Sequence, residues 1–82
     1  MSELSVHEMN RIIEAVLFAA GHPLSYDKIA EVLQISKKEA RKIVKNFADF
    51  YNADDSRGLL LLTFDDSCQL AAKEQYGSYI RT

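Results

Sequence analysis

One stretch, from Arg11 to Ser25 (RIIEAVLFAAGHPLS), limits what this chain can fold into more than any other. On a 3.6-residue repeat it carries most of an apolar stripe, which is what a core-facing helix needs. The stripe consists of Met9, Ile12, Ile13, Val16, Leu17 and Ala20. Phe18 falls on the opposite, polar side, near Arg11 and Glu14. Because a small domain has one core, we expect this second apolar side to be buried against another molecule.

Length and composition fit one soluble globular domain. The chain has 82 residues, of which 48% are hydrophobic and 27% are charged, so it can bury a modest core that gains from good packing or from a partner. No apolar run is long enough to cross a bilayer, and the N-terminus lacks the pattern of a signal peptide. The single cysteine, Cys68, cannot form an internal disulfide, which is typical of proteins in the reducing cytoplasm.

The first helix has clear start and stop signals. Ser5 and Glu8 have the spacing of a capping box, which predicts that the helix begins there. Gly21 suits a left-handed cap and Pro23 cannot continue a helix, so the helix is expected to end near Ala20.

A second and a third helix follow in a helix-turn-helix arrangement. Ser25 caps a short helix from Tyr26 to Leu33. Its inward side carries Tyr26, Ile29, Ala30 and Leu33. Ser36 and Glu39 form another capping box, which opens a third helix from Lys37 to about Tyr51. A short helix, a brief turn and a longer helix are typical of a helix-turn-helix unit.

The second half of the chain predicts a β-hairpin after a polar loop at residues 52–58. Leu59 to Phe64 and Cys68 to Ala72 have the length and flanking turns of two short strands, with Asp65-Asp66-Ser67 between them. The expected fold class is therefore α+β and mainly helical: a winged helix-turn-helix domain with three helices and a two-stranded hairpin as its wing.

The end of the chain carries two further signals. Tyr76, Tyr79 and Ile80 have helical spacing, which indicates a short C-terminal helix, although Gly77 weakens that pattern. The last residues up to Thr82 form neither a cap nor a polar tail. This fits a piece of a longer protein, and a natural end explains it equally well.

The third helix has a basic face. Five of the chain's ten Lys and Arg residues lie on it, namely Lys37, Lys38, Arg41, Lys42 and Lys45. The other side is expected to face the core, with Ala40, Ile43, Val44, Phe47, Phe50 and Tyr51. In a helix-turn-helix protein this helix is the recognition helix, and its basic face could meet phosphates and groove edges. The alternative is a solvated face, with Glu39 and Asp49 as local counterions.

Three features count against sequence-specific DNA binding. Lysines bind phosphates as point charges, but side chains that read bases in a bidentate way are nearly absent from the basic face. Asp65 and Asp66 lie at the predicted wing tip, where they would repel a phosphate backbone. The formal net charge of −2 also argues against an electrostatic grip by the whole domain. Weak nonspecific contact with DNA remains an alternative.

Four residues are candidates for an interface. Phe18 is the first, because large aromatic side chains dominate the energetics of protein contacts; the alternative is that Tyr76 or Tyr79 of the tail covers it. If Leu60, Leu62 and Phe64 face the core, the alternation of a strand turns their neighbours outward. The candidate interface positions are therefore Leu17, Phe18, Leu59 and Leu61.

Signals for catalysis are few. His7 and His22 are isolated near helix ends, and Cys68 has no histidine near it in sequence. The paired aspartates have the character of turn formers without the spacing of a calcium loop. No glycine-rich phosphate loop, CxxC pair or HExxH is present. We expect no enzyme activity, no cofactor and no metal.

The residues from Ile12 to Ser25 (IIEAVLFAAGHPLS) resemble the amino-terminal domain of the segregation and condensation protein B family. The family pattern there reads much like IIEALLFASGEPLS. The resemblance continues through Tyr26–Leu33, Ile35-Ser36 and the charged third helix, and it returns in Arg57-Gly58-Leu59, Gln69-Leu70, Gln75-Tyr76 and Tyr79-Ile80. It covers nearly the whole chain, and the first block is its most specific part.

The resemblance implies a non-enzymatic role. Family members look like two tandem winged-helix domains that dimerise largely through the first and bind the kleisin subunit of the bacterial SMC–kleisin condensin complex. That complex acts in chromosome condensation and partition during cell division. Residues 1–82 would then be the single N-terminal winged-helix domain of a two-domain protein. The chain departs from the family pattern at Asp65-Asp66-Ser67-Cys68, where the family tends toward glycine and an aromatic.

The expected function is thus dimerisation and scaffolding. The resemblance implies a homodimer in the cytoplasm at the nucleoid, with an ScpA-like kleisin and an SMC protein as partners, indirect or weak DNA contact and no membrane. The alternative is a winged-helix transcriptional regulator that uses the basic face on DNA.

Overall fold

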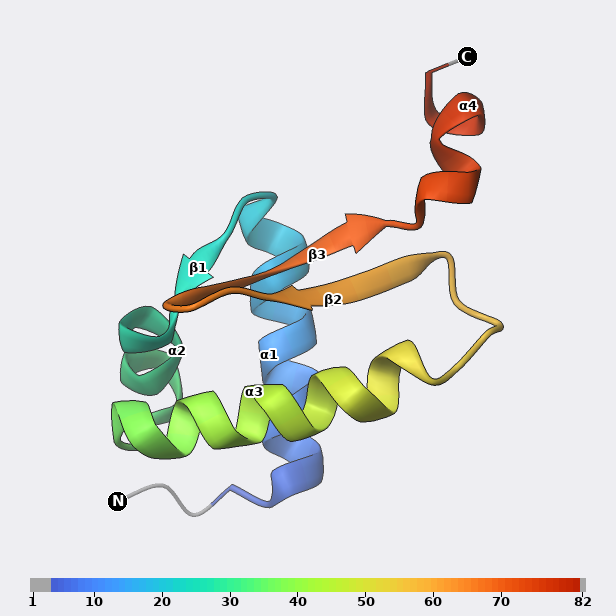
Figure 1. Ribbon diagram of the computed structural model, residues 1–82. Coiled ribbons are helices and arrows are strands. Elements are labelled where there is room, and N and C mark those ends of the chain that lie inside the picture. Colours follow the sequence, from blue (N-terminus) through green and yellow to red (C-terminus); the bar gives the residue numbers. More distant parts are fainter. Residues whose placement is uncertain (1–3, 82) are drawn as a thin grey trace.

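Three helices and a small antiparallel sheet form the body of the molecule, and a short helical tail projects from it (Figure 1). The computed structural model describes residues 4–81, so the chain end at Thr82 lies outside the described part. The elements are α1 (Val6–Ala20), β1 (Leu24–Ser25), α2 (Tyr26–Leu33), α3 (Lys37–Asn52), β2 (Leu59–Thr63), β3 (Ser67–Ala72), the 3₁₀ turn η1 (Glu74–Tyr76) and α4 (Gly77–Ile80). The predicted winged helix-turn-helix fold is confirmed.

The helices start at the serine caps that the sequence predicts. The hydroxyls of Ser5, Ser25 and Ser36 each accept a bond from the backbone N–H three residues further on, at 3.1 Å. At Ser36 the capping box is complete, since the Glu39 carboxylate also accepts the Ser36 N–H at 3.4 Å. Gly21 ends α1 in the left-handed conformation, with φ at 67°.

The sheet has the order β1-β3-β2, and both pairs are antiparallel. The sequence did not predict β1, because two residues are too short to show an alternating pattern. Leu24 lies opposite Cys68, so β1 adds a third strand and joins the start of α2 to the wing. The wing is therefore fixed to the helix-turn-helix unit at the first two residues of β3, Ser67 and Cys68.

The core lies between α1, α2, α3 and one face of the sheet. Its buried side chains are Met9, Ile13, Leu17, Tyr26, Ile29, Ala30, Leu33, Ala40, Val44, Phe47, Ala48, Tyr51, Leu61 and Cys68. The contribution of α2 follows its predicted inward side, whereas the predicted stripe of α1 is too wide: Met9, Ile13 and Leu17 are buried, but Ile12, Val16 and Ala20 are only half-buried. Burial of the Cys68 thiol raises its pKa to about 11, so this cysteine is a neutral core residue at physiological pH.

The predicted orientation of β2 is wrong. Leu61 is 1% exposed, whereas Leu62 is 36% exposed and Phe64 is exposed beyond the end of the strand. Leu59 is half-buried and packs against the core. The register explains this: Leu61 pairs with Leu70 and Thr63 with Cys68, and directly opposed residues share a face of the sheet. Since Cys68 is buried, the face of Leu59 and Leu61 is the inner one.

The predicted core side of α3 is one residue too wide. Phe50 is 75% exposed, although Phe47 and Tyr51 on the same helix are buried and meet edge to face, with ring centroids 5.5 Å apart. Each residue of a helix turns by about 100°, which places Phe50 well round the helix from Tyr51 and outside the buried core.

A side chain of α3 covers the free edge of β2. The Asn52 carboxamide accepts the Leu61 N–H at 2.8 Å and donates to the Leu61 carbonyl at 3.0 Å. It pairs with the strand as a residue of a neighbouring strand would. Asn52 therefore satisfies backbone groups of an edge strand and ties the end of α3 to the wing.

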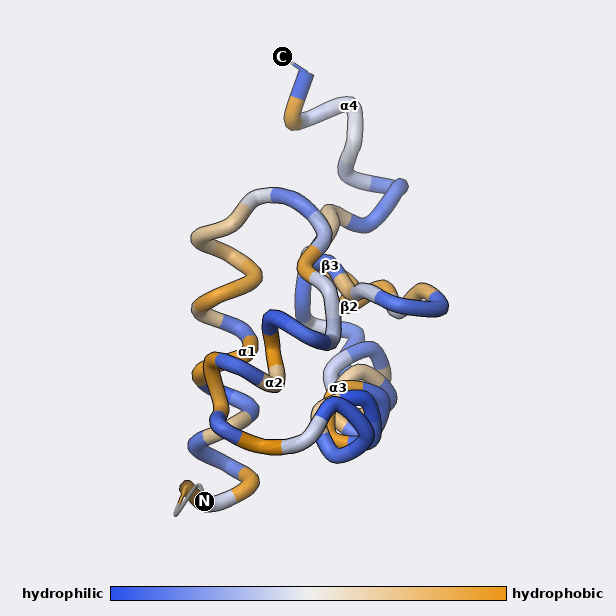
Figure 2. The backbone as a smooth tube through the Cα atoms, turned by 90° about the vertical axis from the view of Figure 1, so that its left-hand side faces the viewer, coloured by the Kyte–Doolittle hydropathy of each residue, from blue (hydrophilic) through white to orange (hydrophobic). Residues whose placement is uncertain are grey.

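The tail confirms the predicted C-terminal helix in a short form. It comprises η1 and the single turn α4, and it points away from the body in both orientations shown (Figures 1 and 2). Tyr79 and Ile80 are exposed there.

Candidate interaction surfaces

The outer side of α1 carries an exposed apolar surface. Phe18 is 75% exposed, and its helical neighbours Ala15 and Ala19 are exposed as well. Ile12 and Val16 border them and are half-buried. We call these five residues the α1 patch. In Figure 2, α1 lies along the left-hand side of the molecule, and its C-terminal half is mostly hydrophobic.

The α1 patch follows from the geometry of one helix that serves two surfaces. Leu17 points into the core with only 2% of its surface exposed, and Phe18 lies about 100° further round the helix. The prediction that Phe18 faces away from the core is confirmed. The alternative that Tyr76 or Tyr79 covers it is wrong, because three quarters of Phe18 remains exposed.

The other three candidate interface residues are not surface anchors in this structure. Leu17 and Leu61 belong to the buried core, and Leu59 packs against that core from its edge. Leu59 and Leu61 were expected to point outward because the opposite face of β2 was assigned to the core. Of the four candidates only Phe18 is largely exposed. Ala15 and Ala19 were missed; Phe18 and Ala19 follow Ala15 at i+3 and i+4, and this spacing is the signal that identifies them.

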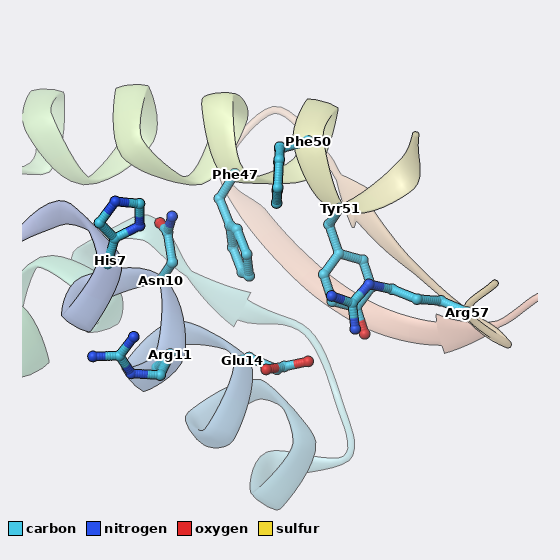
Figure 3. Close-up of a pocket in the computed structure, with 8 residues that line it drawn as sticks. All are labelled: His7, Asn10, Arg11, Glu14, Phe47, Phe50, Tyr51 and Arg57. Carbon is cyan, nitrogen blue, oxygen red and sulfur yellow. The ribbon is translucent and has the colours of Figure 1, made fainter. Parts of the chain in front are cut away.

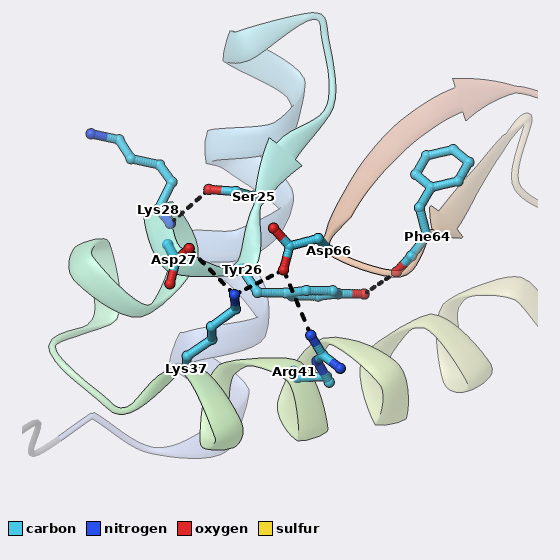
Figure 4. A network of polar contacts seen from close by, with 8 residues as sticks. All are labelled: Ser25, Tyr26, Asp27, Lys28, Lys37, Arg41, Phe64 and Asp66. Atoms are coloured by element: carbon cyan, nitrogen blue, oxygen red, sulfur yellow. Dashed lines mark hydrogen bonds and ion pairs between the residues drawn. The ribbon is translucent and has the colours of Figure 1, made fainter.

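The basic face of α3 meets the tip of the wing. The Asp66 carboxylate lies 2.8 Å from the Lys37 ammonium and 3.7 Å from the Arg41 guanidinium (Figure 4). A second carboxylate, that of Asp27 at the start of α2, lies 3.4 Å from Lys37. The structure therefore brings two of the five predicted basic residues into ion pairs with acidic residues from other elements.

Tyr26 holds the wing tip in this position. Its backbone N–H donates to the Asp66 carbonyl at 3.0 Å, and its hydroxyl donates to the Phe64 carbonyl at 3.4 Å. The Arg41 guanidinium lies over its ring, 5.2 Å from the centroid. Burial raises the pKa of the Tyr26 hydroxyl, which keeps it protonated as a donor. Backbone and side chain together fix Asp66 beside the basic face.

The predicted local counterions are wrong. Among residues 4–81, Glu39 and Asp49 form no ion pair with the basic face, and Glu39 is engaged in the cap of α3. Lys38, Lys42 and Lys45 are exposed and have no ion-pair partner within that range. The basic face is thus divided into a paired part and an open part.

The ion pair between Asp66 and Lys37 predicts a lowered pKa for the Asp66 carboxyl group. A hydrogen bond and charge attraction from Lys37, with a smaller effect of Arg41, lower the pKa of Asp66 below its ordinary value of 3.8. An NMR titration should therefore give Asp66 a midpoint below 3.8, and Lys37→Ala should move it upward. Because the pKa is lowered in the folded state, the contribution of the pair to stability is present above the ordinary pKa and is lost as the pH falls through the lowered one.

Lys38→Ala is the matched control for that titration, because Lys38 is a neighbouring lysine without an ion pair in the described part of the chain. It should leave the midpoint of Asp66 nearly unchanged. A wild-type midpoint at or above 3.8 would contradict the contact between Asp66 and Lys37.

A third surface feature is a small hollow of about 180 Å³ between α1 and α3 (Figure 3). It is lined by His7, Asn10, Arg11, Glu14, Phe47, Phe50, Tyr51 and Arg57. The Arg57 guanidinium lies 4.4 Å from the centre of the Tyr51 ring. Burial, followed by the nearby Glu14 carboxylate, raises the pKa of the Tyr51 hydroxyl. The hollow therefore combines aromatic side chains with charged side chains of both signs.

Reactive or metal-binding arrangements do not appear in the described residues. Between residues 4 and 81, no three His, Cys, Asp or Glu side chains gather so that they could hold a metal ion. His7 and His22 are exposed, and His22 Nδ1 lies 2.9 Å from the Pro23 carbonyl. None of the helices described is both long and apolar enough to span a membrane.

Comparison with known proteins gives one family. The family described as segregation and condensation complex subunit ScpB matches residues 11–82. A segregation and condensation protein B of Ruminiclostridium cellulolyticum is 35% identical over 77 residues, which cover 94% of this chain and 40% of the relative. That of Clostridium acetobutylicum is 37% identical over 82 residues, or 99% of this chain and 40% of the relative. The chain spans about two fifths of the length of these relatives.

Solved structures give the same result for the fold. A crystal structure of a dimer of an ScpB N-terminal domain complexed with an ScpA peptide matches with a TM-score of 0.80 and 31% identity, over 93% of this chain and 94% of that one. ScpB from Mycobacterium tuberculosis matches with a TM-score of 0.83 over 98% of this chain and 49% of that chain. Its identity is 19%, so this second likeness concerns the fold alone.

Proposed function

The chain belongs to the ScpB family of segregation and condensation complex subunits, and from that premise we propose that it is a non-enzymatic dimerisation and scaffolding domain. Its role would lie in chromosome condensation and segregation during cell division, as an accessory part of a condensin complex. The observation that carries the proposal is the α1 patch with Phe18 at its centre. The family membership favours this function over that of a transcriptional regulator.

The physical support is an apolar surface that the domain cannot cover by itself. Exposed aromatic side chains that pack into a partner supply much of the energy of an interface, and Ala15 and Ala19 let a second helix approach closely. Desolvating polar groups at such a contact would cost free energy. This cost is small here because α1 carries no charged side chain from Ala15 to Ala20. We therefore propose the α1 patch as the surface that meets a second copy of the chain.

Relatives supply the remaining partners of the proposal. The related N-terminal domain whose crystal structure matches is a dimer that holds an ScpA peptide. We propose that this chain likewise forms a homodimer and meets an ScpA-like kleisin, within a complex that contains an SMC protein. We further propose that residues 1–82 are the first winged-helix domain of a two-domain protein located in the cytoplasm at the nucleoid, with at most weak or indirect DNA contact.

Two phenylalanines with equal exposure allow a matched test. Phe18 and Phe50 are each 75% exposed, but they lie on α1 and α3. Sedimentation equilibrium should give a dimer for the wild type, and Phe18→Glu should raise its dissociation constant at least about tenfold, because a charge would be buried at the centre of the contact. Phe50→Glu introduces the same charge and should change it less than about threefold.

Two results would overturn the proposal. A wild-type chain that remains monomeric at millimolar concentration would remove the dimer. If Phe50→Glu weakened the dimer and Phe18→Glu did not, dimerisation would stand but the α1 patch would no longer be its surface.

A further inference from the structure

The open part of the basic face borders two hollows beside the wing tip. One, of about 330 Å³, is lined only by Lys37, Lys38 and Arg41. The other, of about 320 Å³, lies between the wing and α3 and is lined by Tyr26, Arg41, Lys45, Thr63, Phe64 and Asp65. Arg41 lines both of them, and the Asp66 carboxylate pairs with Arg41 and Lys37. An anion from the chain itself is thus bound at the rim of an all-cationic hollow.

We propose that the hollow of Lys37, Lys38 and Arg41 is a binding site for the phosphate backbone of duplex DNA, and that Asp66 occupies its cationic groups in the free chain. The carboxylate of Asp66 stands where a phosphate oxygen would stand. The proposal is independent of dimerisation, because the basic face and the α1 patch lie on different helices.

The arrangement of the cations favours a polyanion over a single anion. Lys37, Arg41 and Lys45 follow one another at i, i+4 spacing, which sets them about 6 Å apart along the helix. Lys38 and Lys42 form a parallel row one residue further round. Two rows of regularly spaced charges on the third helix of a winged-helix domain can contact several phosphates of a duplex at once. A compact ion would contact fewer of these basic side chains.

The same residues determine what kind of DNA contact this is. Lysines neutralise phosphates as point charges, and Arg41 is already stacked on the Tyr26 ring, so the face carries little that reads base edges. Binding should therefore be independent of sequence and strongly weakened by salt. Exposed ion pairs are individually weak, so a duplex can displace the Asp66 carboxylate from Lys37. The displaced carboxylate then lies beside the phosphates and repels them.

The test compares two aspartates at the wing tip. Asp66→Asn and Asp65→Asn change the net charge equally, but of these two aspartates only Asp66 forms ion pairs with Lys37 and Arg41 in the described structure. Asp27, which also pairs with Lys37, is unchanged in both variants. We expect fluorescence anisotropy with a labelled 20-base-pair duplex in 50 mM salt to show about a three- to tenfold gain in affinity for Asp66→Asn. Asp65→Asn should gain less than about twofold. The slope of log affinity against log salt should steepen by about one to two for Asp66→Asn, as each new phosphate contact adds about 0.9.

A double variant and a second probe complete the experiment. Adding Arg41→Glu to Asp66→Asn should return the affinity to the wild-type value or below, with circular dichroism confirming that the fold is kept. Equal gains for Asp65→Asn and Asp66→Asn would overturn the occupancy by Asp66. No binding by any variant in 20 mM salt would overturn the site. If Asp66→Asn raised the affinity for a polyglutamate peptide as much as the affinity for the duplex, the site would bind acidic protein segments. That result would overturn the assignment to DNA.

Discussion

Replacing Leu61 by alanine is expected to lower the free energy of unfolding by about 3 kcal/mol, whereas Leu62→Ala should lower it by less than about 1 kcal/mol. Leu61 is 1% exposed and belongs to the core, so its removal leaves a cavity; Leu62 is 36% exposed on the outer face of β2. Urea denaturation followed by far-ultraviolet circular dichroism measures both. A domain of this size has roughly 4 to 12 kcal/mol of stability, so the first loss is large but measurable.

The two substitutions remove the same atoms from adjacent positions of one strand. Any change in intrinsic strand propensity is therefore common to both, and the difference between them reports which face of β2 is buried. Leu61→Val provides a milder version, should Leu61→Ala unfold the chain, and is expected to cost about 1 kcal/mol. Losses of equal size, or a larger loss at Leu62, would contradict the observed orientation of the strand.

The orientation of β2 is one part of the fold that sequence patterns predicted wrongly, and the reason is physical. Four consecutive leucines have no alternation, so they do not show which face is inward. The neighbouring strand does show it, because the polar Gln69 separates the apolar Cys68 and Leu70. The Phe64 N–H donates to the Ser67 carbonyl at 2.8 Å, which closes a two-residue turn and carries that face across to Leu61.

Helix boundaries were predicted well because their causes are local. A serine that caps an N-terminus needs only the N–H groups of the next turn, and Gly21 ends α1 by its own backbone conformation. The exposure of Phe18 is local in the same sense, since Leu17 sets the inward direction of the same helix. Such features can be derived without knowing how the rest of the chain folds.

The wing tip shows the opposite situation. Asp66 was predicted to repel phosphates, but its contact with Lys37, which joins residues far apart in the sequence, was not predicted. The contact needs β1, whose two residues join the wing to α2 and place Asp66 next to Tyr26. Because β1 has no detectable sequence pattern, the division of the basic face into paired and open parts could be seen only in three dimensions.

Asn52→Ala is expected to lower the free energy of unfolding by about 2 kcal/mol, which is more than its partial exposure would suggest. The substitution leaves the N–H and the carbonyl of Leu61 without their partners, which now lie at 2.8 and 3.0 Å. Unpaired polar groups of this kind cost about 1 to 3 kcal/mol where water does not replace the lost bond. Thermal or urea unfolding of Asn52→Ala measures the loss, and Asn46→Ala, at an exposed asparagine of the same helix, should cost less than about 0.5 kcal/mol.

Asn52→Asp separates the two hydrogen bonds. Aspartate still accepts the Leu61 N–H, but it presents a second oxygen to the Leu61 carbonyl, so it should be less stable than the wild type at neutral pH. The opened edge of β2 also has a consequence beyond stability, because unpaired backbone groups on an edge strand favour pairing with another chain. Asn52→Ala should therefore aggregate more readily than Asn46→Ala, as measured by light scattering at equal concentration. Equal stability of the two alanine variants would mean that Asn52 does not act as a substitute for a neighbouring strand.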